Sequence, residues 1–570
     1  MADADSQFSI CSSHEYRFVL VFSIIALTTA SVPYIVGAAL ATENRLFGGF
    51  VYGVEDCYSY LAKMRQGAEG TWLFHIAYTP EPHPGTFFFP FHLLLGKAAA
   101  LLPGGDLTAR MVWVYHGARV IFGLGLLLTV YRFLALFTRR VAVRRLAWLM
   151  VTFGGGLGWL SVALGQSNWL GSMPLDFILP EGFTFLVLYA LPHIALARTL
   201  LLWGILFLLR AWGVGPKPEV QGPNHASRIT HRVLRITHYA SRTMHRAAMA
   251  GVCWLAMGLI VPFYVAVAWA VAWAAWVALV LRRRRVMWQE ALVTTVAALI
   301  SAPVVAYSAW VFTTDPVYAT WAAQNRILSP HPLHYLAAYG VPLVLAAFAV
   351  RDAWRDEGPA WLALAWVAVV PLLVYLPFNL QRRLVEGVQV PLSLLTAWGV
   401  LSISKSRTQS PKPVLVGVVL VVLSLTNVLL VAGNCLALRG QPSPIYRETG
   451  EVAALDWLNG RVEPGDVVLA AYETGNYLPA RVGARAFVGH GPESVHADEK
   501  KALVARFFDA TTDDAWRRQL LAQYGVDYVF SGPAERALGD FDAGRAMYLR
   551  RVYDTDRYVV FGVGELGVNE

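Results

Sequence analysis

The sequence predicts a polytopic α-helical membrane protein that carries a small α/β domain at its C-terminal end. Of its 570 residues, 56% are hydrophobic and only 15% are charged, whereas about a quarter are charged in an ordinary soluble domain. Apolar runs of about 20 residues, the length that a helix needs to cross a bilayer, recur along most of the chain. The positive charges lie in short clusters between these runs, which indicates membrane orientation rather than nucleic-acid binding.

The apolar runs predict about eleven membrane crossings. The first, Phe18–Leu40, is too long for the core of a signal peptide, so we expect a retained anchor. The Lys and Arg clusters between the runs alternate correctly only with the N-terminus in the cytoplasm, and an odd number of crossings then places the C-terminus outside. The predicted crossings are 18–40, 107–137, 146–165, 183–210, 248–261, 263–281, 289–312, 335–350, 358–378, 388–404 and 413–438.

The connecting segments complete a predicted membrane domain over residues 1–439. Residues 41–106 form the first outer loop, and 211–246 form a basic cytoplasmic loop. Within the outer loop, Phe87–Leu102 is apolar but short. A crossing there would move the following Arg cluster to the outside, so we expect a re-entrant or interfacial segment.

The sequence of residues 440–570 predicts that this segment forms a separate soluble α/β domain on the extracytoplasmic side. Acidic residues outnumber basic ones there, and the segment has no cysteine. Helical patterns alternate with β-rich runs, which is typical of a small α/β fold. The helical patterns are Glu448–Asn459, Ala497–Phe508 and Asp513–Tyr524, and the β-rich runs are Val467–Ala470, Ala486–Val488, Tyr528–Phe530 and Tyr558–Gly562.

An acidic pair opens an amphipathic helical pattern in the first outer loop. Leu61 and Met64 lie on one apolar stripe, and we expect this helix to lie along the membrane surface. Asp56 and Lys63 share a neighbouring stripe, while Glu55 points about 100° away, so only one of the two acids can face a given cavity. As an alternative, both acids only complement the positive N-terminus of the helix.

Two adjacent arginines lie between the ninth and tenth predicted crossings on the outer side. Positive charge normally concentrates in the cytoplasmic loops of membrane proteins, and Arg382 and Arg383, next to Gln381, depart from this rule. Their planar, permanently charged guanidinium groups suit a phosphate. The alternatives are an ion pair with Glu386 or contact with lipid headgroups. Arg326, in another outer loop, is a weaker candidate of the same kind.

Other polar residues are less informative. Glu81 and His83 precede the short apolar segment, and the structure of a proline-rich loop explains them as well as catalysis does. The sequence has no clear metal-ligand motif, so dependence on a divalent metal stays open.

The whole pattern resembles the GT-C superfamily of membrane glycosyltransferases. The likeness rests on one crossing followed by a long outer loop, an acidic pair that opens a helix, His83-Pro84 before a short apolar segment, and about a dozen crossings before an outer α/β domain. The chain departs from many members in having Gly85 after Pro84, and it has no clear Asp-x-Asp in the second outer loop.

The resemblance implies a function in the cell envelope. Asp56 would act on the acceptor, with Glu55 as its partner or substitute. The donor would be a hexose or pentose on polyprenyl phosphate, transferred with inversion, and Arg382 and Arg383 would bind the lipid phosphate on grounds of location. The acceptor could be a glycan, a lipid or a protein.

The chemistry agrees with these residue types. A phosphate leaving group needs cations, whereas a hydroxyl acceptor needs a base. A transporter or flippase for lipid-linked glycans, using the same arginines, and a glycan-binding membrane protein without turnover are the alternatives.

Overall fold

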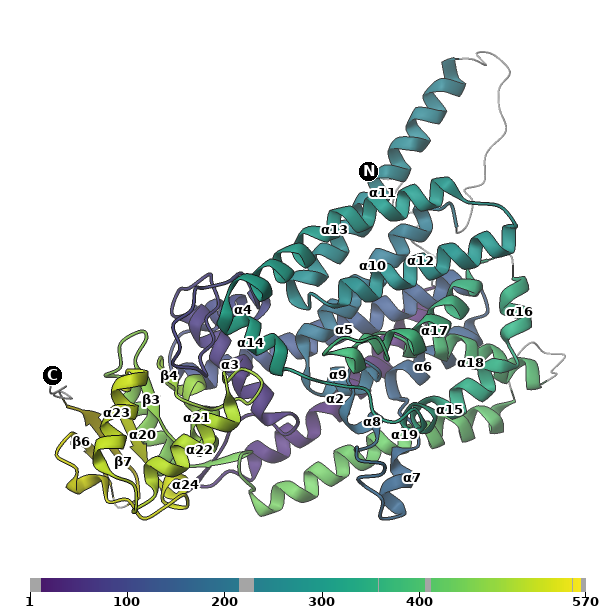
Figure 1. Cartoon of the computed structure of the whole chain (residues 1–570). Helices are drawn as coiled ribbons and strands as arrows, with labels where there is room; N and C mark the ends of the chain where they lie inside the picture. The colour runs from purple at the N-terminus through teal and green to yellow at the C-terminus, as the bar shows by residue number, and fades with distance from the viewer. Residues whose placement is uncertain (1–11, 215–229, 357, 405–411, 556, 565–570) are drawn as a thin grey trace. The chain divides into compact units, whose positions relative to one another are not determined.

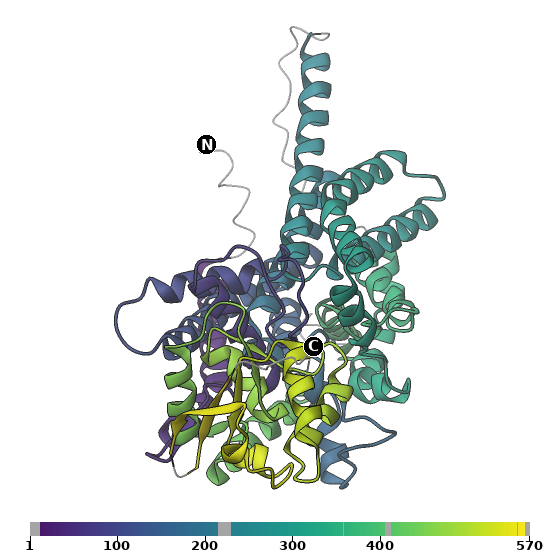
Figure 2. The same ribbon diagram turned by 60° about the vertical axis from the view of Figure 1, so that its left-hand side comes forward.

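The computed structural model describes residues 12–214, 230–356, 358–404, 412–555 and 557–564, and Figures 1 and 2 show the chain from two directions. The chain divides into two compact units. The helical unit combines Met1–Ser31, Ala118–Ser308 and Ile327–Ala432. The mixed unit combines Val32–Gly117, Ala309–Arg326 and Gly433–Glu570.

The chain is a multi-pass helical membrane protein. Seven of the described helices are long and apolar enough to cross a membrane, and three shorter apolar helices coincide with further predicted crossings, although the count of eleven stays a prediction. The long helices are α2 (Ser13–Ala39), α5 (Leu107–Phe137), α10 (Pro192–Ala211), α11 (Thr230–Ile260), α12 (Tyr264–Arg283), α13 (Trp288–Thr314) and α19 (Pro413–Ala437). The shorter ones are α15 (Leu333–Ala347), α17 (Ala360–Leu373) and α18 (Gln389–Ser404).

Helix α11 begins inside the predicted cytoplasmic loop 211–246. Its first turns extend beyond the neighbouring ends of α10 and α13 in the ribbon (Figure 1). The second half of this loop is therefore helical. Residues 215–229 of the loop lie outside the described residues.

Two predicted crossings are interrupted. The run 146–165 divides into α6 (Val141–Phe153) and α7 (Gly158–Ala163) around a glycine loop. The buried carboxylate of Asp176 accepts a hydrogen bond from the Gly156 N–H at 2.9 Å, which replaces the helical bond that the break removes.

The run 183–210 divides in the same way into α9 (Thr184–Ala190) and α10. Pro192 begins α10, and proline cannot donate the backbone hydrogen bond that a continuous helix requires. The short helices α8 (Leu175–Ile178) and α16 (Val350–Arg355) and the 3₁₀ turn η2 (Gln381–Val385) complete the helical unit.

The mixed unit contains a five-stranded sheet in the order β4-β3-β5-β7-β6. β4, β3 and β5 are parallel, while β7 pairs antiparallel with both β5 and β6. The strands are β3 (Val467–Leu469), β4 (Arg485–Ala486), β5 (Tyr528–Ser531), β6 (Leu549–Asp554) and β7 (Val559–Val563). The helices of residues 440–570, the C-terminal segment, are α20 (Thr449–Asn459), α21 (Tyr472–Arg481), α22 (Ala497–Phe508), α23 (Asp514–Tyr524) and α24 (Pro533–Arg536).

Residues 440–570 share one hydrophobic core with the first outer loop. Tyr58 and Leu61 of α3 (Val54–Ala68) pack in the same buried cluster as Leu455 and Leu478. β1 (Arg45–Phe47) also pairs antiparallel with β2 (Tyr446–Glu448). In the structure, the C-terminal segment is therefore part of a larger unit that begins before the predicted boundary at residue 440.

The apolar stripe of α3 faces protein rather than lipid. Leu61 and Met64 are both fully buried in that core. We expected the stripe to lie on the membrane surface, and this expectation is wrong because the C-terminal segment covers it. Local periodicity shows that a helix has an apolar face, but it does not show what packs there.

Helix α4 (Pro90–Ala100) packs closely against α3. A Cβ on Gly96 would lie 1.7 Å from the Met64 carbonyl oxygen, and a Cβ on Gly67 would lie 2.1 Å from the Leu93 carbonyl oxygen. Only glycine permits this approach of the two backbones. With 11 residues, α4 is also shorter than a membrane crossing. Helix α14 (Pro316–Gln324) belongs to the same unit.

Candidate active site

The acidic pair lies in the first turn of α3. Gly53 precedes the helix with a φ of 55°, a left-handed conformation that glycine adopts without strain and that turns the chain sharply into the helix. Glu55 and Asp56 follow in the first turn, where a carboxylate also interacts favourably with the helix dipole. Both acids therefore lie where they can complement the positive N-terminus of the helix, and each acid also has a specific hydrogen-bond partner.

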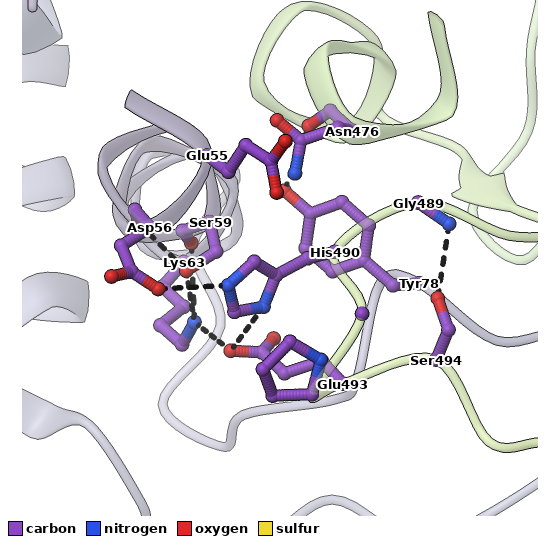
Figure 3. A network of polar contacts seen from close by, with 12 residues as sticks. Glu55, Asp56, Ser59, Lys63, Tyr78, Asn476, Gly489, His490, Glu493 and Ser494 are labelled. Atoms are coloured by element: carbon purple, nitrogen blue, oxygen red, sulfur yellow. Dashed lines mark hydrogen bonds and ion pairs between the residues drawn. The ribbon is translucent and has the colours of Figure 1, made fainter. Parts of the chain in front are cut away.

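Asp56 faces His490, a residue 434 positions later in the chain (Figure 3). The Nε2 atom of His490 lies 2.9 Å from Oδ1 of Asp56. The Asp56 side chain is 53% exposed, whereas that of His490 is only 7% exposed. An accessible carboxylate is therefore held from behind by a buried imidazole.

A second ion pair lies behind His490. Oε1 of Glu493 is 3.6 Å from the His490 Nδ1 atom and accepts a 2.6 Å hydrogen bond from Lys63 Nζ. Lys63 is 1% exposed, and its ammonium lies 4.6 Å from the centre of the Phe89 ring. Charges of alternating sign therefore run from the exposed Asp56 carboxylate to the buried Lys63 ammonium, and Lys63 supports the site from inside the protein.

These contacts change the titration of His490. Burial alone would lower its pKa, but the hydrogen bonds and charges of Asp56 and Glu493 raise the pKa of His490 to about 9. Burial raises the pKa of Glu493, but the charges and hydrogen bonds of Lys63 and His490 together hold this pKa below its ordinary value. At neutral pH, His490 is therefore a cation whose Nε2–H donates to Asp56.

The loop that carries His490 is fixed by its own hydrogen bonds. Ser494 Oγ accepts the Gly489 N–H at 2.9 Å, and the Glu493 N–H donates to the His490 carbonyl at 3.0 Å. The Gln324 side chain, at the end of α14, donates to the Ser494 carbonyl at 2.6 Å. This loop directly follows β4, so the sheet and α14 together position the imidazole.

Glu55 has a different partner. Its Oε2 atom accepts a 3.1 Å hydrogen bond from the Tyr472 hydroxyl at the start of α21. The same hydroxyl accepts a bond from the Gly491 N–H at 3.1 Å. The two acids therefore diverge, as the helical spacing predicts, and Asp56 is the one that pairs with a buried cation.

Glu81 and His83 make hydrogen bonds within the first outer loop, and Glu81 also binds Lys500. Glu81 accepts a 2.6 Å bond from Lys500 Nζ and a short bond from the Thr79 hydroxyl. Nε2 of His83 accepts the Ile76 N–H at 2.8 Å, and its Nδ1 lies 2.8 Å from the Glu81 carbonyl oxygen. Both ring nitrogens are engaged in the loop and burial lowers the pKa of His83, which favours the structural alternative for this pair.

Arg382 and Arg383 lie on η2 in the helical unit. The Arg383 Nε atom is 3.5 Å from Oε1 of Glu181, and the Arg383 side chain is 34% exposed. The expected alternative partner, Glu386, is instead paired with the fully buried Arg198. Arg383 therefore lies beside Glu181, and not beside Glu386, the acid that the sequence offers as an alternative partner.

The neighbouring candidates differ in role. The Gln381 side chain accepts the Ser329 N–H and donates to the Leu376 carbonyl, both at 2.9 Å, so it fixes the loop around η2. Arg326 is exposed and ends a segment of the mixed unit.

Among the described residues, no group of three or more His, Cys, Asp or Glu side chains is arranged to hold a metal ion. At the Asp56 site, the Glu493 carboxylate is bound to Lys63 and Asp56 to His490. With these partners, the two carboxylates do not fit a divalent cation.

The sequence alone does not identify His490 or Glu493 as candidate site residues. The available signal is weak: a polar, glycine- and proline-containing loop directly follows a β-rich run. Such a loop is a common place for functional side chains, but its partner in α3 cannot be read from local spacing.

Solved structures that resemble this chain include glycosyltransferases of the GT-C superfamily. The arabinofuranosyltransferase AftD from Mycobacteria aligns with 96% of this chain and 41% of its own, at 15% identity and a TM-score of 0.51. ArnT from Cupriavidus metallidurans aligns over 98% and 100% of the two chains, at 13% identity and a TM-score of 0.49. The Archaeoglobus fulgidus oligosaccharyltransferase aligns over 94% and 73%, at 12% identity and a TM-score of 0.47.

No protein-family model matches the sequence, and no curated protein matches it. The solved structures, and not these two comparisons, confirm at the level of the fold the resemblance to the GT-C superfamily that the sequence predicts.

Proposed function

We propose that the protein is an integral-membrane glycosyltransferase that moves a sugar from a polyprenyl-phosphate donor to a hydroxyl acceptor at the outer face of the cell membrane. The observation that carries the proposal is the exposed Asp56 carboxylate, hydrogen-bonded at 2.9 Å to the buried His490. The fold shared with AftD supports glycosyl transfer as the general class of reaction.

In this reaction the acceptor oxygen attacks the anomeric carbon of the donor sugar. A new carbon–oxygen bond forms, the bond to the donor phosphate breaks, and the phosphate leaves with the bonding electron pair. Asp56 takes the proton of the acceptor hydroxyl as the attack proceeds. A single displacement of this kind inverts the anomeric configuration.

His490 positions the base in this scheme. Its cationic ring donates a hydrogen bond to one oxygen of Asp56, which fixes the orientation of the carboxylate before attack. Glu493 and Lys63 in turn hold the ring from behind. His490 is thus a positioning residue, because it acts through Asp56.

Arg382 and Arg383 bind the donor phosphate in our proposal. The support is chemical: adjacent guanidiniums on η2 offer planar, permanently charged donors, and Arg383 keeps exposed surface beside Glu181. A departing phosphate is already a stable anion, so two cations suffice without a general acid.

The test is transfer from a synthetic polyprenyl-phosphate sugar by the purified full-length protein. We expect Asp56→Asn to lower kcat at least about 100-fold, the loss typical of removing a general base. Glu55→Gln is the matched control, because it removes the neighbouring charge from the same helical turn, and it should keep most of the activity. Full transfer by Asp56→Asn would overturn the assignment.

The arginines give a separable outcome. Arg382→Gln with Arg383→Gln should raise KM for the donor about tenfold or more, as expected for loss of charge-assisted phosphate contacts. If lipid-linked sugar crosses vesicle membranes containing the protein while no glycosidic bond forms, the protein is a transporter and the proposal is wrong.

A further inference from the structure

The helical unit contains a large cavity that includes none of the residues of the candidate active site. Its volume is about 1270 Å³. The cavity lies where α5 and α12 end and where α17 begins. Its basic lining comes from Arg139, Arg140, Arg282, Arg283 and Arg285.

The guanidinium groups of this cavity are weakly compensated. Arg282 donates a 2.7 Å hydrogen bond to the Asp356 carbonyl and lies 6.0 Å from the centre of the Trp361 ring. Arg139, Arg140, Arg283 and Arg285 are exposed, and in the described part of the chain no carboxylate oxygen lies within 4.0 Å of their guanidinium nitrogens. Several like charges that converge on one space favour an anionic ligand.

Three acids also line the wall: Glu290, Asp352 and Asp356. They leave the lining with an excess of positive charge. They also offer acceptors for hydroxyl or ammonium groups. The lining therefore suits a phosphate that carries such a polar group better than it suits a polyanion.

A buried donor provides an independent observation. Trp212 lines the cavity, is 7% exposed, and stacks on Trp361 with ring centres 6.2 Å apart. Its indole N–H has no hydrogen-bond partner among the described residues. A buried donor left unpaired is costly, and an oxygen acceptor from a ligand would satisfy it.

We propose that this cavity binds the phosphate-bearing headgroup of an anionic membrane lipid. Arg283 and Arg285 would contact the phosphate, Trp212 would donate to one of its oxygens, and the carboxylates would accept from the polar group beyond it. A lipid is favoured over a soluble phosphate because the site lies at the ends of apolar helices and is flanked by tryptophan, a side chain that accumulates at membrane interfaces.

The test measures lipid binding to the purified full-length protein in detergent by native mass spectrometry. The probes are phosphatidylglycerol, phosphatidylcholine and inorganic phosphate. Arg283→Gln with Arg285→Gln should weaken phosphatidylglycerol binding about tenfold. The matched control is Arg351→Gln with Arg355→Gln, which removes the same charge from exposed residues of α16 outside the cavity and should leave binding within twofold.

Equal effects of the two double variants, or no effect of either, would overturn the proposal. Inorganic phosphate that displaces the lipid at equal concentration would overturn the lipid assignment. Trp212→Phe tests the donor, because it keeps a ring in place and removes only the N–H. It should weaken binding several-fold with an unchanged melting temperature in the absence of lipid, and unchanged binding would contradict the role given to Trp212.

Discussion

At the scale of single residues, His490 makes the stability of the mixed unit depend on pH. Its folded-state pKa of about 9 lies above the ordinary value of 6.5. The raised pKa therefore stabilises the fold fully below pH 6.5, and this contribution is lost as the pH rises to 9. From the shift we expect a loss on the order of 3 kcal/mol. Denaturant unfolding across this range should show the decline in the natural protein and a flatter profile in His490→Gln.

Lys63 carries the second prediction at this scale. Lys63→Met leaves the buried Glu493 carboxylate without its ammonium partner, which should cost about 3–5 kcal/mol of unfolding free energy. Adding Glu493→Gln should recover part of the loss, because it removes a buried charge that keeps only its 3.6 Å contact with His490. Lys501→Met, in an exposed pair with Asp498, should cost no more than about 1 kcal/mol. Equal losses in the two single variants would contradict the buried pair.

At the scale of elements, the contact between α3 and α4 depends on glycine. Gly96→Ala places a methyl group 1.7 Å from a backbone oxygen of α3, so the two helices must separate. We expect a loss of several kcal/mol and a lower melting temperature, since overpacking of this kind cannot be relieved by a side-chain rotation. Gly117→Ala in α5 meets nothing within 4 Å, so it should be neutral or slightly stabilising. A Gly96→Ala protein as stable as the control would refute the close approach.

The elements also show what the sequence can predict. The bilayer imposes a helix length, so each apolar run contains at least one helix of the structure, although α11 begins well before its run and two runs are broken. Hydropathy does not predict the breaks at Gly156 and Pro192: a carboxylate binds the backbone of the first, and a proline at the second leaves the run equally apolar. Asp56 was predicted from the local acidic pair, but its contact with His490 joins residues 434 positions apart, and no spacing rule reaches that far.

At the scale of the whole molecule, the core of the mixed unit makes a prediction about the C-terminal segment. Tyr58 and Leu61 of α3 complete the cluster that contains Leu455 and Leu478, and β1 completes a ladder with β2. A fragment of residues 440–570 would expose this apolar surface to water. We therefore expect the fragment to bind a hydrophobic dye, to give poorly dispersed NMR spectra and to unfold without cooperativity. The full-length chain, in which α3 covers the surface, is the control, and its residues 440–570 should resist a protease concentration that digests the fragment. A fragment that unfolds in one sharp transition would show that the segment is an independent domain, as its composition alone suggests.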